Sequence, residues 1–374
     1  MRTKDLINQN KEPTVSIVIL NFNGESYLEN CLSSVLNTDY PSFEVILFDN
    51  ASTDQSLVFA RERFGNDERL KIVRAENNLG FASGNNAAFK HTSGKYVIFL
   101  NNDTIVDTGW VSALVEVLEN DSTIGIAQSL IFEISGEKIA PSGAGWLVDP
   151  YLALRKPLGP YEPGEYTFPA VFETSFAVGA AMAARREFLN KIGLFDPKFP
   201  FFYDDIFLSL KTWLANKRVV TVSKSKVNHI ESATFKRSGW RLHKMYCQIF
   251  RGLITLLLNM HADTKDFPKA FFIFSFSVLL RDSGLARGKN VDINFVSAYA
   301  CACVWILANL KYIWRRRLEV WNRAEIAPET LIHRFAKIKI PDRFYFLKDI
   351  YYKSQVQEYQ NSLIKKVSAR AKKE

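Results

Sequence analysis

The chain has few cysteines and no apolar leader. Its 374 residues include four cysteines, whose spacing is that of neither a zinc site nor a disulfide framework. Residues 1–14 are polar and mixed in charge and lack the apolar stretch of a secretory signal. These absences predict a reducing environment, with the folded part of the chain in the cytosol. The cysteines are Cys31, Cys247, Cys301 and Cys303.

Two glycine-rich phosphate-binding motifs are also missing. No Gly-x-Gly-x-x-Gly follows the first apolar run, and the chain has no P-loop of the form Gly-x-x-x-x-Gly-Lys-Ser/Thr. These absences argue against a dinucleotide-dependent dehydrogenase and against a P-loop NTPase.

The excess of positive charge is confined to one end of the chain. Between Lys311 and Glu374, sixteen Lys and Arg residues stand against seven Asp and Glu residues, which accounts for the whole formal net charge of +9. A globally basic protein would suggest nucleic acid as a partner. A neutral body with a basic end after apolar helices instead favours anionic lipid head groups, and no nucleic acid. A solvated helical tail without a partner is the alternative.

Strand and helix patterns alternate between about Val15 and Leu118. Apolar strands are predicted at 15–20, 43–48, 70–73 and 96–100, separated by polar loops and amphipathic helices. This alternation predicts right-handed crossovers and an α/β fold with a mostly parallel sheet. The length suggests one large unit of this kind with an appendage.

Polar residues follow each of the four strands. Parallel strands end at one edge of a sheet, so these loops are expected to converge. Amide and carboxylate side chains can bind a base or ribose, and helix N-termini offer N–H groups to phosphates, which suits a nucleoside diphosphate. Ordinary turn and cap hydrogen bonding is the alternative for each loop alone. The loops are Asn21-Phe22, Asp49-Asn50, Asn78 to Gly80 and Asn101 to Asp103.

Three acidic residues and one histidine are candidates for chemistry. Asp103 follows a buried strand and would place a hard oxygen ligand at the sheet edge. Asp204 and Asp205 lie in apolar surroundings, where carboxylates are costly to bury unless they find partners or a function. An acidic pair that favours a helix dipole is the alternative. His229, after a short strand at 219–222, is either a structural residue or a ligand.

These segments together resemble the family 2 inverting glycosyltransferases of GT-A fold. The most similar branch contains rhamnosyl- and galactofuranosyl-transferases of cell-surface polysaccharides, and the resemblance covers roughly residues 13 to 260. The segments that carry it are Val15 to Gly24, Asp49 to Asp54, Asn78 to Asn86 and Leu100 to Thr104.

The resemblance implies a role for each candidate on the donor side. Asp103 matches the last Asp of the family's D-x-D motif, which holds a divalent cation (Mg or Mn) on the donor diphosphate, and His229 would complete that site. Asn101 stands where the motif has its first Asp. The implied donor-binding residues are Leu20, Asn21, Phe22, Asp49, Asn50, Asn78, Gly80, Asn85, Asn101 and Asn102.

On the acceptor side, the resemblance implies that Asp205 is the base that deprotonates the acceptor hydroxyl and that Asp204 helps to place the acceptor. Gly179 and Ala180 lie in the segment that matches the family's stretch beside the sugar and acceptor. Two further positions of the acidic motif differ, because Phe207 and Lys211 stand where the family often has an acid and an Arg. The division of roles between the two carboxylates therefore stays open.

The last part of the chain is apolar and then basic. Apolar segments occur at 252–260, 267–280 and 293–313, and Arg315 to Arg317 follow directly. Helices on a membrane surface are expected; a spanning helix or hairpin, a helical core and a contact between copies are the alternatives. The predicted division is a polar tail at 1–13, a catalytic domain at 14–260 and a membrane-associating helical region at 261–374. Within the domain, 14–118 is the nucleotide-binding half and 119–260 the acceptor half.

The predicted function is metal-dependent transfer, with inversion, of a hexosyl or deoxyhexosyl group. The donor is a nucleotide-diphosphate sugar, and the acceptor is a glycan or is lipid-linked. The expected location is the cytoplasmic face of the cell membrane. The alternative is a non-catalytic scaffold of GT-A fold in a membrane complex that assembles glycans.

Overall fold

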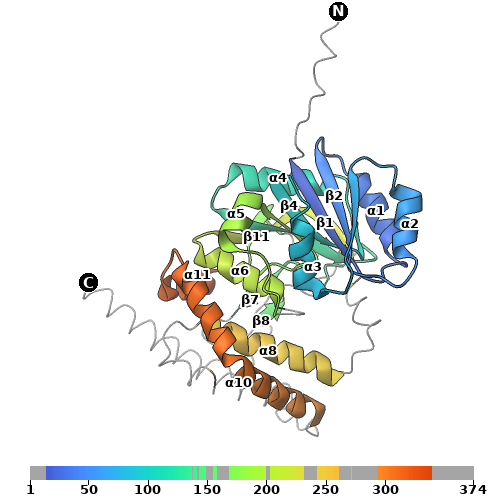
Figure 1. Cartoon of the computed structure of the whole chain (residues 1–374). Coiled ribbons are helices and arrows are strands. Elements are labelled where there is room, and N and C mark those ends of the chain that lie inside the picture. Colours follow the sequence, from blue (N-terminus) through green and yellow to red (C-terminus); the bar gives the residue numbers. More distant parts are fainter. Residues whose placement is uncertain are drawn as a thin grey trace, which may run out of the picture.

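The computed structural model describes residues 14–136, 138–140, 143–148, 155–157, 168–198, 203–230, 242–260, 271 and 293–338. Within them, a nine-stranded sheet has helices on both faces (Figure 1). The strands are β1 (Val15–Asn21), β2 (Phe43–Asp49), β3 (Leu70–Arg74), β4 (Tyr96–Asn101), β5 (Thr104–Val106), β6 (Ile124–Glu133), β7 (Trp146–Val148), β8 (Arg155–Pro157), β9 (Val171–Glu173), β10 (Ala181–Arg185) and β11 (Arg218–His229). The helices are α1 (Leu28–Leu36), α2 (Ser56–Phe64), α3 (Gly80–Phe89), α4 (Trp110–Asn120), α5 (Arg186–Ile192), α6 (Asp204–Leu214), α8 (Leu242–Met260), α10 (Ile293–Asn322) and α11 (Pro328–Lys337).

Most strands of the large sheet run in one direction. Its order is β3-β2-β1-β4-β10-β6-β11-β5, with β9 also paired to β11, and β7 and β8 form a separate pair. The first four of these strands are mutually parallel, which confirms the fold predicted from the alternating pattern. Strand β10 runs antiparallel between β4 and β6, and β5 and β9 run antiparallel to β11. The sheet is therefore parallel from β3 to β4 and mixed from β10 to β5.

Strand β11 is longer than the sequence pattern predicts. A short strand was expected at 219–222, with His229 following it, but β11 extends over twelve residues and ends at His229. The register against β6 shifts between Val222 and Lys226, as it does at a β-bulge. Beyond this shift, the strand exchanges its neighbour β9 for β5. The residues around the shift are polar, so apolar periodicity in the sequence does not indicate that the strand continues to His229.

Two hydrophobic cores cover the two faces of the sheet. Successive side chains of a strand point to opposite faces, so Ile17 and Ile19 of β1 join the core under α1 and α4, whereas Val18 joins the other. One face of α1 packs on the sheet, because Leu28, Cys31, Leu32 and Val35 are all buried. The second core contains side chains from α3, α5, α6, α8, α10 and α11.

Helices α8 and α10 pack against each other beside α6 (Figure 1). They contain the helical segments predicted at 252–260 and 293–313. The predicted helix at 267–280 lies outside the described residues except for Phe271. At the contact between α8 and α10, the Phe250 ring meets the Phe295 ring, and the thiols of Cys247 and Cys301 lie 3.2 Å apart.

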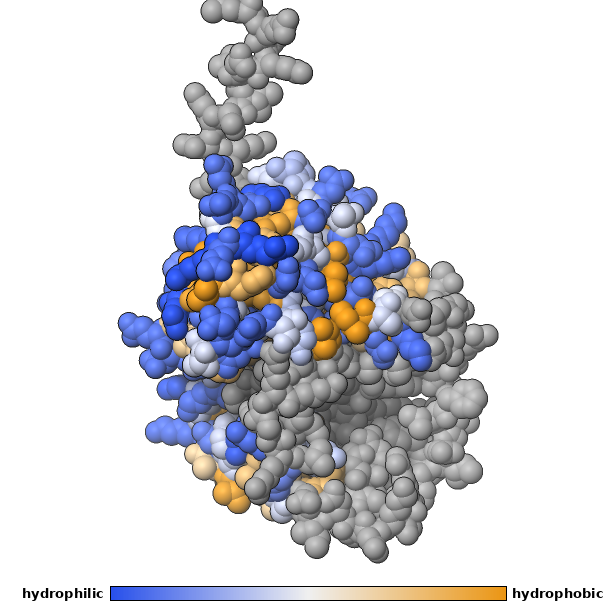
Figure 2. All heavy atoms as spheres, turned by 90° about the vertical axis from the view of Figure 1, so that its right-hand side faces the viewer, coloured by the Kyte–Doolittle hydropathy of each residue, from blue (hydrophilic) through white to orange (hydrophobic). Residues whose placement is uncertain are grey.

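The side of the molecule that carries α1 and α2 has a mostly hydrophilic surface. On the face seen in Figure 2, which is the right-hand side of Figure 1, the coloured atoms are mostly hydrophilic with separate apolar areas between them. Val58 of α2 is one exposed apolar residue there.

Candidate functional site

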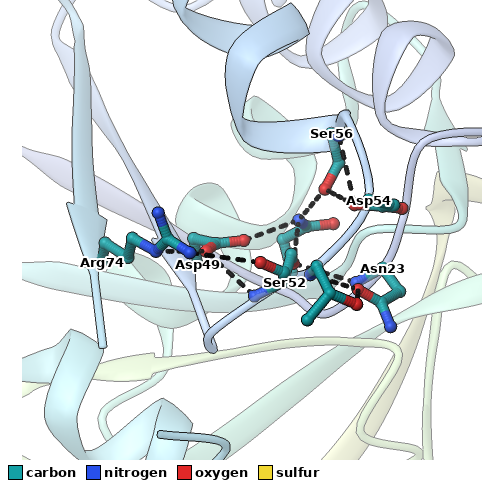
Figure 3. Close-up of polar contacts among 8 residues, drawn as sticks. Asn23, Asp49, Ser52, Asp54, Ser56 and Arg74 are labelled. Carbon is teal, nitrogen blue, oxygen red and sulfur yellow. Dashed lines mark hydrogen bonds and ion pairs between the residues drawn. The ribbon is translucent and has the colours of Figure 1, made fainter. Parts of the chain in front are cut away.

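The ends of β1 and β2 lie side by side and share a hydrogen-bond network. Asn21 pairs with Asp49 in the sheet register, and both side chains are fully buried. The Asn21 amide donates to Asp49 Oδ1 at 3.1 Å, to Ser52 Oγ at 3.2 Å and to Ser56 Oγ at 2.9 Å. Figure 3 shows these groups converging from the loops after the two strands. The Asn21 side chain therefore holds the loops after β1 and β2 together.

Asp49 is enclosed by its partners. Its Oδ2 atom accepts a hydrogen bond from the Ser52 N–H at 3.2 Å and lies 3.7 Å from Arg74 Nε at the end of β3. Ala51, between Asn50 and Ser52, has a φ of 63°, which turns the chain so that the Ser52 N–H reaches the carboxylate. Such a backbone conformation is strained for a residue with a Cβ atom and is found preferentially at functional sites.

Asn50 fixes the loop that precedes α3. Its amide nitrogen donates to Asn78 Oδ1 at 3.0 Å and to the Gly80 carbonyl at 3.2 Å, and its Oδ1 accepts from the Leu79 N–H at 2.8 Å. Gly80 has a φ of 77°, which favours glycine. The N-terminus of α3 is therefore held at the same sheet edge as Asp49.

The loop after β1 needs a glycine. A Cβ at Gly24 would lie 2.1 Å from Asn21 Oδ1 and 2.3 Å from Asn102 Nδ2, and these two side chains are joined by a hydrogen bond of 2.8 Å. Phe22 is 38% exposed at the rim of this loop, so its ring is accessible to a ligand. Asn102, at the end of β4, thus connects to the network of β1 and β2.

The side chains of Asp103 and His229 meet at this edge. Strand β5 pairs with β11 so that His229 lies opposite Thr104, and the Ile230 N–H donates to the Asp103 carbonyl. His229 Nε2 lies 3.1 Å from Asp103 Oδ1 and 3.3 Å from Asn101 Nδ2. Asp103 is buried and His229 is nearly so.

This pair has donor atoms that fit a divalent cation. In the part of the chain that the structure describes, no cluster of three or more His, Cys, Asp or Glu side chains is arranged to hold a metal. One carboxylate and one imidazole nevertheless suit Mg or Mn, because such ions take part of their ligand shell from the phosphates of the substrate. An imidazole binds a metal through a nitrogen lone pair, so Nε2 of His229 would be the ligand atom beside Oδ1 of Asp103.

The two carboxylates of the acidic pair differ in their surroundings. Asp204 is 3% exposed, and its Oδ2 atom has no hydrogen-bond partner among the described residues. Burial and the neighbouring Asp205 raise the pKa of Asp204 well above its ordinary value, so its neutral form is favoured. Asp205 is only half-buried; its Oδ2 accepts from the Gly179 N–H at 2.9 Å and its Oδ1 from the Ile206 N–H at 2.7 Å.

Gly179 brings the acidic pair next to the donor side. A Cβ at Gly179 would lie 3.4 Å from Asp205 Oδ2 and 3.4 Å from the Phe81 ring in the first turn of α3. The adjacent Ala180 is buried, and its carbonyl accepts from the Asn101 N–H at 2.9 Å. Gly179 and Ala180 therefore connect the end of β4 to the start of α6.

Two further predicted donor-side residues lie in or against α3. Asn85 is buried and donates to the Phe81 carbonyl within α3, so it contributes to the helix itself. Leu20 packs against α3, where a Cβ at Gly84 would lie 2.7 Å from its Cδ1 atom.

Lys211 is one of the two positions that differ from the family motif. Its side chain holds backbone of the acceptor half in place. Its ammonium group donates to the carbonyls of Gly193 and Leu194 at 2.6 and 2.5 Å. Burial lowers the pKa of Lys211 to about 7.

Sequence reasoning missed several members of the site. Ser52 and Ser56 belong to the network around Asn21, and Asn23 accepts a hydrogen bond from the Thr53 N–H (Figure 3). Their signal was the run of small polar residues from Asp49 to Ser56, which favours turns stabilised by side chains. Nothing local in the sequence indicated Arg74.

Comparison with known proteins identifies the domain. Residues 16–193 match the model of the family described as "Glycosyl transferase family 2". The "O-antigen biosynthesis protein RfbC" of Myxococcus xanthus is 29% identical over 229 residues, which is 59% of this chain and 18% of that protein. The "Putative teichuronic acid biosynthesis glycosyltransferase TuaG" of Bacillus subtilis (strain 168) is 35% identical over 94 residues, which is 25% of this chain and 37% of that protein. The chain thus spans less than two fifths of these relatives.

Solved structures show the fold. A crystal structure described as "GalNAc-T7 with UDP, GalNAc and Mn2+" has a TM-score of 0.54 and 20% sequence identity, covering 81% of this chain and 58% of that one. The chain therefore has the GT-A fold, and residues 16–193 match the glycosyltransferase family 2 model.

Proposed function

We propose that this protein transfers a sugar, with inversion, from a nucleotide-diphosphate donor to a glycan or lipid-linked acceptor in a reaction that depends on a divalent cation. The contact between Asp103 and His229 carries the proposal, because it puts two metal-binding side chains at the edge where the strands of the donor half end. Both belong to a chain with a family 2 domain.

The donor nucleotide is assigned to the loops after β1, β2 and β3. Leu20 and Phe22 would flank the base, and Asp49 and Asn50 would bind base and ribose. Asn78 and Gly80 lie at the N-terminus of α3, where the positive end of the helix dipole favours phosphate. Asn21, Asn85, Asn101 and Asn102 would support this side from buried or half-buried positions.

Asp103 and His229 are assigned to the cation, Mg or Mn. The ion would neutralise charge on the leaving diphosphate and so stabilise its departure. The solved structure with UDP and Mn2+ supports a divalent cation in this fold. Asn101 in place of a second carboxylate leaves the phosphates to supply more of the coordination.

Asp205 is assigned as the base that takes the proton of the acceptor hydroxyl. It is the more exposed carboxylate of the pair, and the N–H groups of Gly179 and Ile206 fix its orientation. Asp204 would keep its proton, because burial favours the neutral acid. A pair of carboxyl groups in unequal surroundings typically divides its roles in this way.

The proposed substrate class and location are supported by relatives and by the second half of the chain. The printed names of two relatives refer to O-antigen and teichuronic acid biosynthesis, so we assign the reaction to cell-envelope polysaccharides. The proposed transferred sugar is a deoxyhexosyl group such as rhamnosyl or a hexosyl group such as galactofuranosyl. The proposed location is the cytoplasmic face of the membrane, through α10 and the basic residues that follow.

The test is release of nucleoside diphosphate from a panel of UDP-, GDP- and dTDP-sugars by the full-length protein. One donor class is expected to bind and turn over with Mn2+, and EDTA should abolish the release. Anomeric proton NMR of the transferred sugar would establish inversion. Failure of every donor to bind or react would favour the non-catalytic scaffold.

A further inference from the structure

One face of helix α10 is apolar and exposed along the length of the helix. Val304 and Leu307 are 67% and 71% exposed. Among the described helices, α10 is the one long and apolar enough to cross a membrane, over Phe295–Asn322. Only 28% of its apolar window is buried, unlike a core helix. The exposed apolar residues recur at helical spacing on one side. They are Val296, Val304, Leu307, Leu310, Trp314 and Leu318, which we call the outer stripe.

The opposite face of α10 is fixed to the rest of the protein. Phe295, Ala298, Ala302 and Ile306 are buried in the core shared with α6 and α8. Polar contacts hold the second half of the helix: Arg317 donates to the Leu258 carbonyl, Trp321 to the Asn259 carbonyl, and Tyr312 and Arg316 to the Asp196 carboxylate.

These contacts exclude a spanning role for α10 in this structure. Crossing a bilayer would require the helix to leave α8 and would place Arg316 and Arg317 away from their partners, in or next to lipid, at a cost of several kcal/mol. A helix held on one side and apolar on the other can instead lie in the plane of a membrane surface.

The charges on the outer stripe favour an anionic surface. Lys311 and Arg315 are exposed on the same side as Leu307, Trp314 and Leu318, since residues three and four apart are neighbours on a helix. Arg315 lies 3.8 Å from Glu319, and no acidic residue occurs in α10 before Glu319. In a symmetric pair of α10 helices, this positive charge would face an identical stripe whose carboxylate, Glu319, already lies beside Arg315, whereas anionic lipids would neutralise it along the helix.

We propose that the outer stripe of α10 docks the protein on the surface of an anionic bilayer, with the apolar side chains in the interface and Lys311 and Arg315 at the head groups. The helix stays packed on α8, so the protein lies on the membrane without spanning it. Trp314 would take the interfacial position that tryptophan favours. This inference does not depend on the proposed sugar transfer.

The test is flotation of the full-length protein with vesicles of phosphatidylcholine alone or with 30% phosphatidylglycerol. The double variant Leu307→Gln/Leu318→Gln should bind the mixed vesicles at least ten-fold more weakly, because two leucines no longer enter the interface. Val58→Gln/Ile134→Gln is the matched control: these residues are 49% and 46% exposed but lie outside α10, and binding should be unchanged. Lys311→Gln/Arg315→Gln should weaken binding about five-fold per charge on the mixed vesicles and leave binding to phosphatidylcholine unchanged.

Three results would overturn the proposal. Equal loss of binding in the control would show that the effect is not specific to α10. Resistance of the wild-type protein to extraction from cell membranes by alkaline carbonate would show a spanning segment. A dimer that Leu307→Gln/Leu318→Gln converts to a monomer, with vesicle binding unchanged, would assign the outer stripe to a second copy. Circular dichroism checks that each variant folds.

Discussion

The Nε2 atom of His229 lies 3.1 Å from Oδ1 of Asp103, at the end of the β11–β5 pair. Asp103 follows the parallel half of the sheet, and His229 comes from the second half of the chain. Their contact therefore joins the donor loops to the part of the chain that carries Asp204 and Asp205. The proposed roles of Asp103, Asp204 and Asp205 can each be tested by a single substitution.

Replacing Asp103 with Ala is expected to abolish cation-dependent donor binding, because it removes the only carboxylate of its motif. The variant should still fold, although loss of the buried contact with His229 should lower the free energy of unfolding by about 1 kcal/mol. Asp107→Ala, which removes an exposed carboxylate four residues further on, is the control and should bind donor normally. Calorimetric titration with nucleotide sugar and Mn2+ measures both. Undiminished donor binding by Asp103→Ala would refute the metal assignment.

Asp205→Asn keeps the shape of the side chain and removes its basicity. We expect kcat to fall about 10²–10⁴-fold, with donor affinity nearly unchanged. Asp204→Asn should mainly raise the acceptor KM, because burial already favours a neutral group at this position. Steady-state kinetics with donor and acceptor varied separately distinguishes the two. A nearly normal Asp205→Asn enzyme beside an inactive Asp204→Asn enzyme would reverse the roles.

Gly252 of α8 sets the position of the acidic pair through Tyr203. A Cβ at residue 252 would lie 1.8 Å from the Tyr203 ring, and Tyr203 immediately precedes Asp204 at the start of α6. Gly252→Ala should lower the free energy of unfolding by about 1–3 kcal/mol and reduce kcat, because the ring must move. Gly109→Ala is the control, since a Cβ there meets nothing within 4 Å. Chemical denaturation and turnover are the measurements; wild-type values for Gly252→Ala would contradict the packing described here.

Arg316 and Arg315 are neighbours with different expected effects on stability. Arg316 Nε donates at 2.8 Å to the fully buried Asp196, so Arg316→Met should destabilise the protein by about 2–3 kcal/mol. The loss is limited because the Tyr312 hydroxyl and the Lys198 N–H still donate to the carboxylate. Arg315 is 69% exposed, and Arg315→Met should change stability by less than about 0.5 kcal/mol. Equal effects in urea denaturation would show that the buried ion pair does not hold α10 in solution.

Much of the donor half could be predicted from the sequence. Apolar runs of strand length, each ending in polar residues, predicted β1 to β4 and their parallel direction, because buried parallel strands need apolar side chains on both faces. The same pattern predicted that the loops with Asn21 and Asp49 would converge, and the structure makes these two residues register partners. It did not predict that Asn21 would be fully enclosed by Asp49, Ser52 and Ser56, since burial depends on loops that only meet after folding.

The sequence by itself determined which residues carry the chemistry: the amides and carboxylates at the strand ends, the acidic pair and the apolar, basic character of α10. Only the tertiary structure decided which of them meet. The register shift in β11 brings His229 to Asp103, and Gly179 brings Asp205 close to Phe81. It also decided which face of α10 is buried, because the packing of Phe295 and Ala302 on α8 leaves the outer stripe exposed. Local propensity acts over a few residues, whereas these contacts join segments that are adjacent only after the sheet and its covering helices have formed.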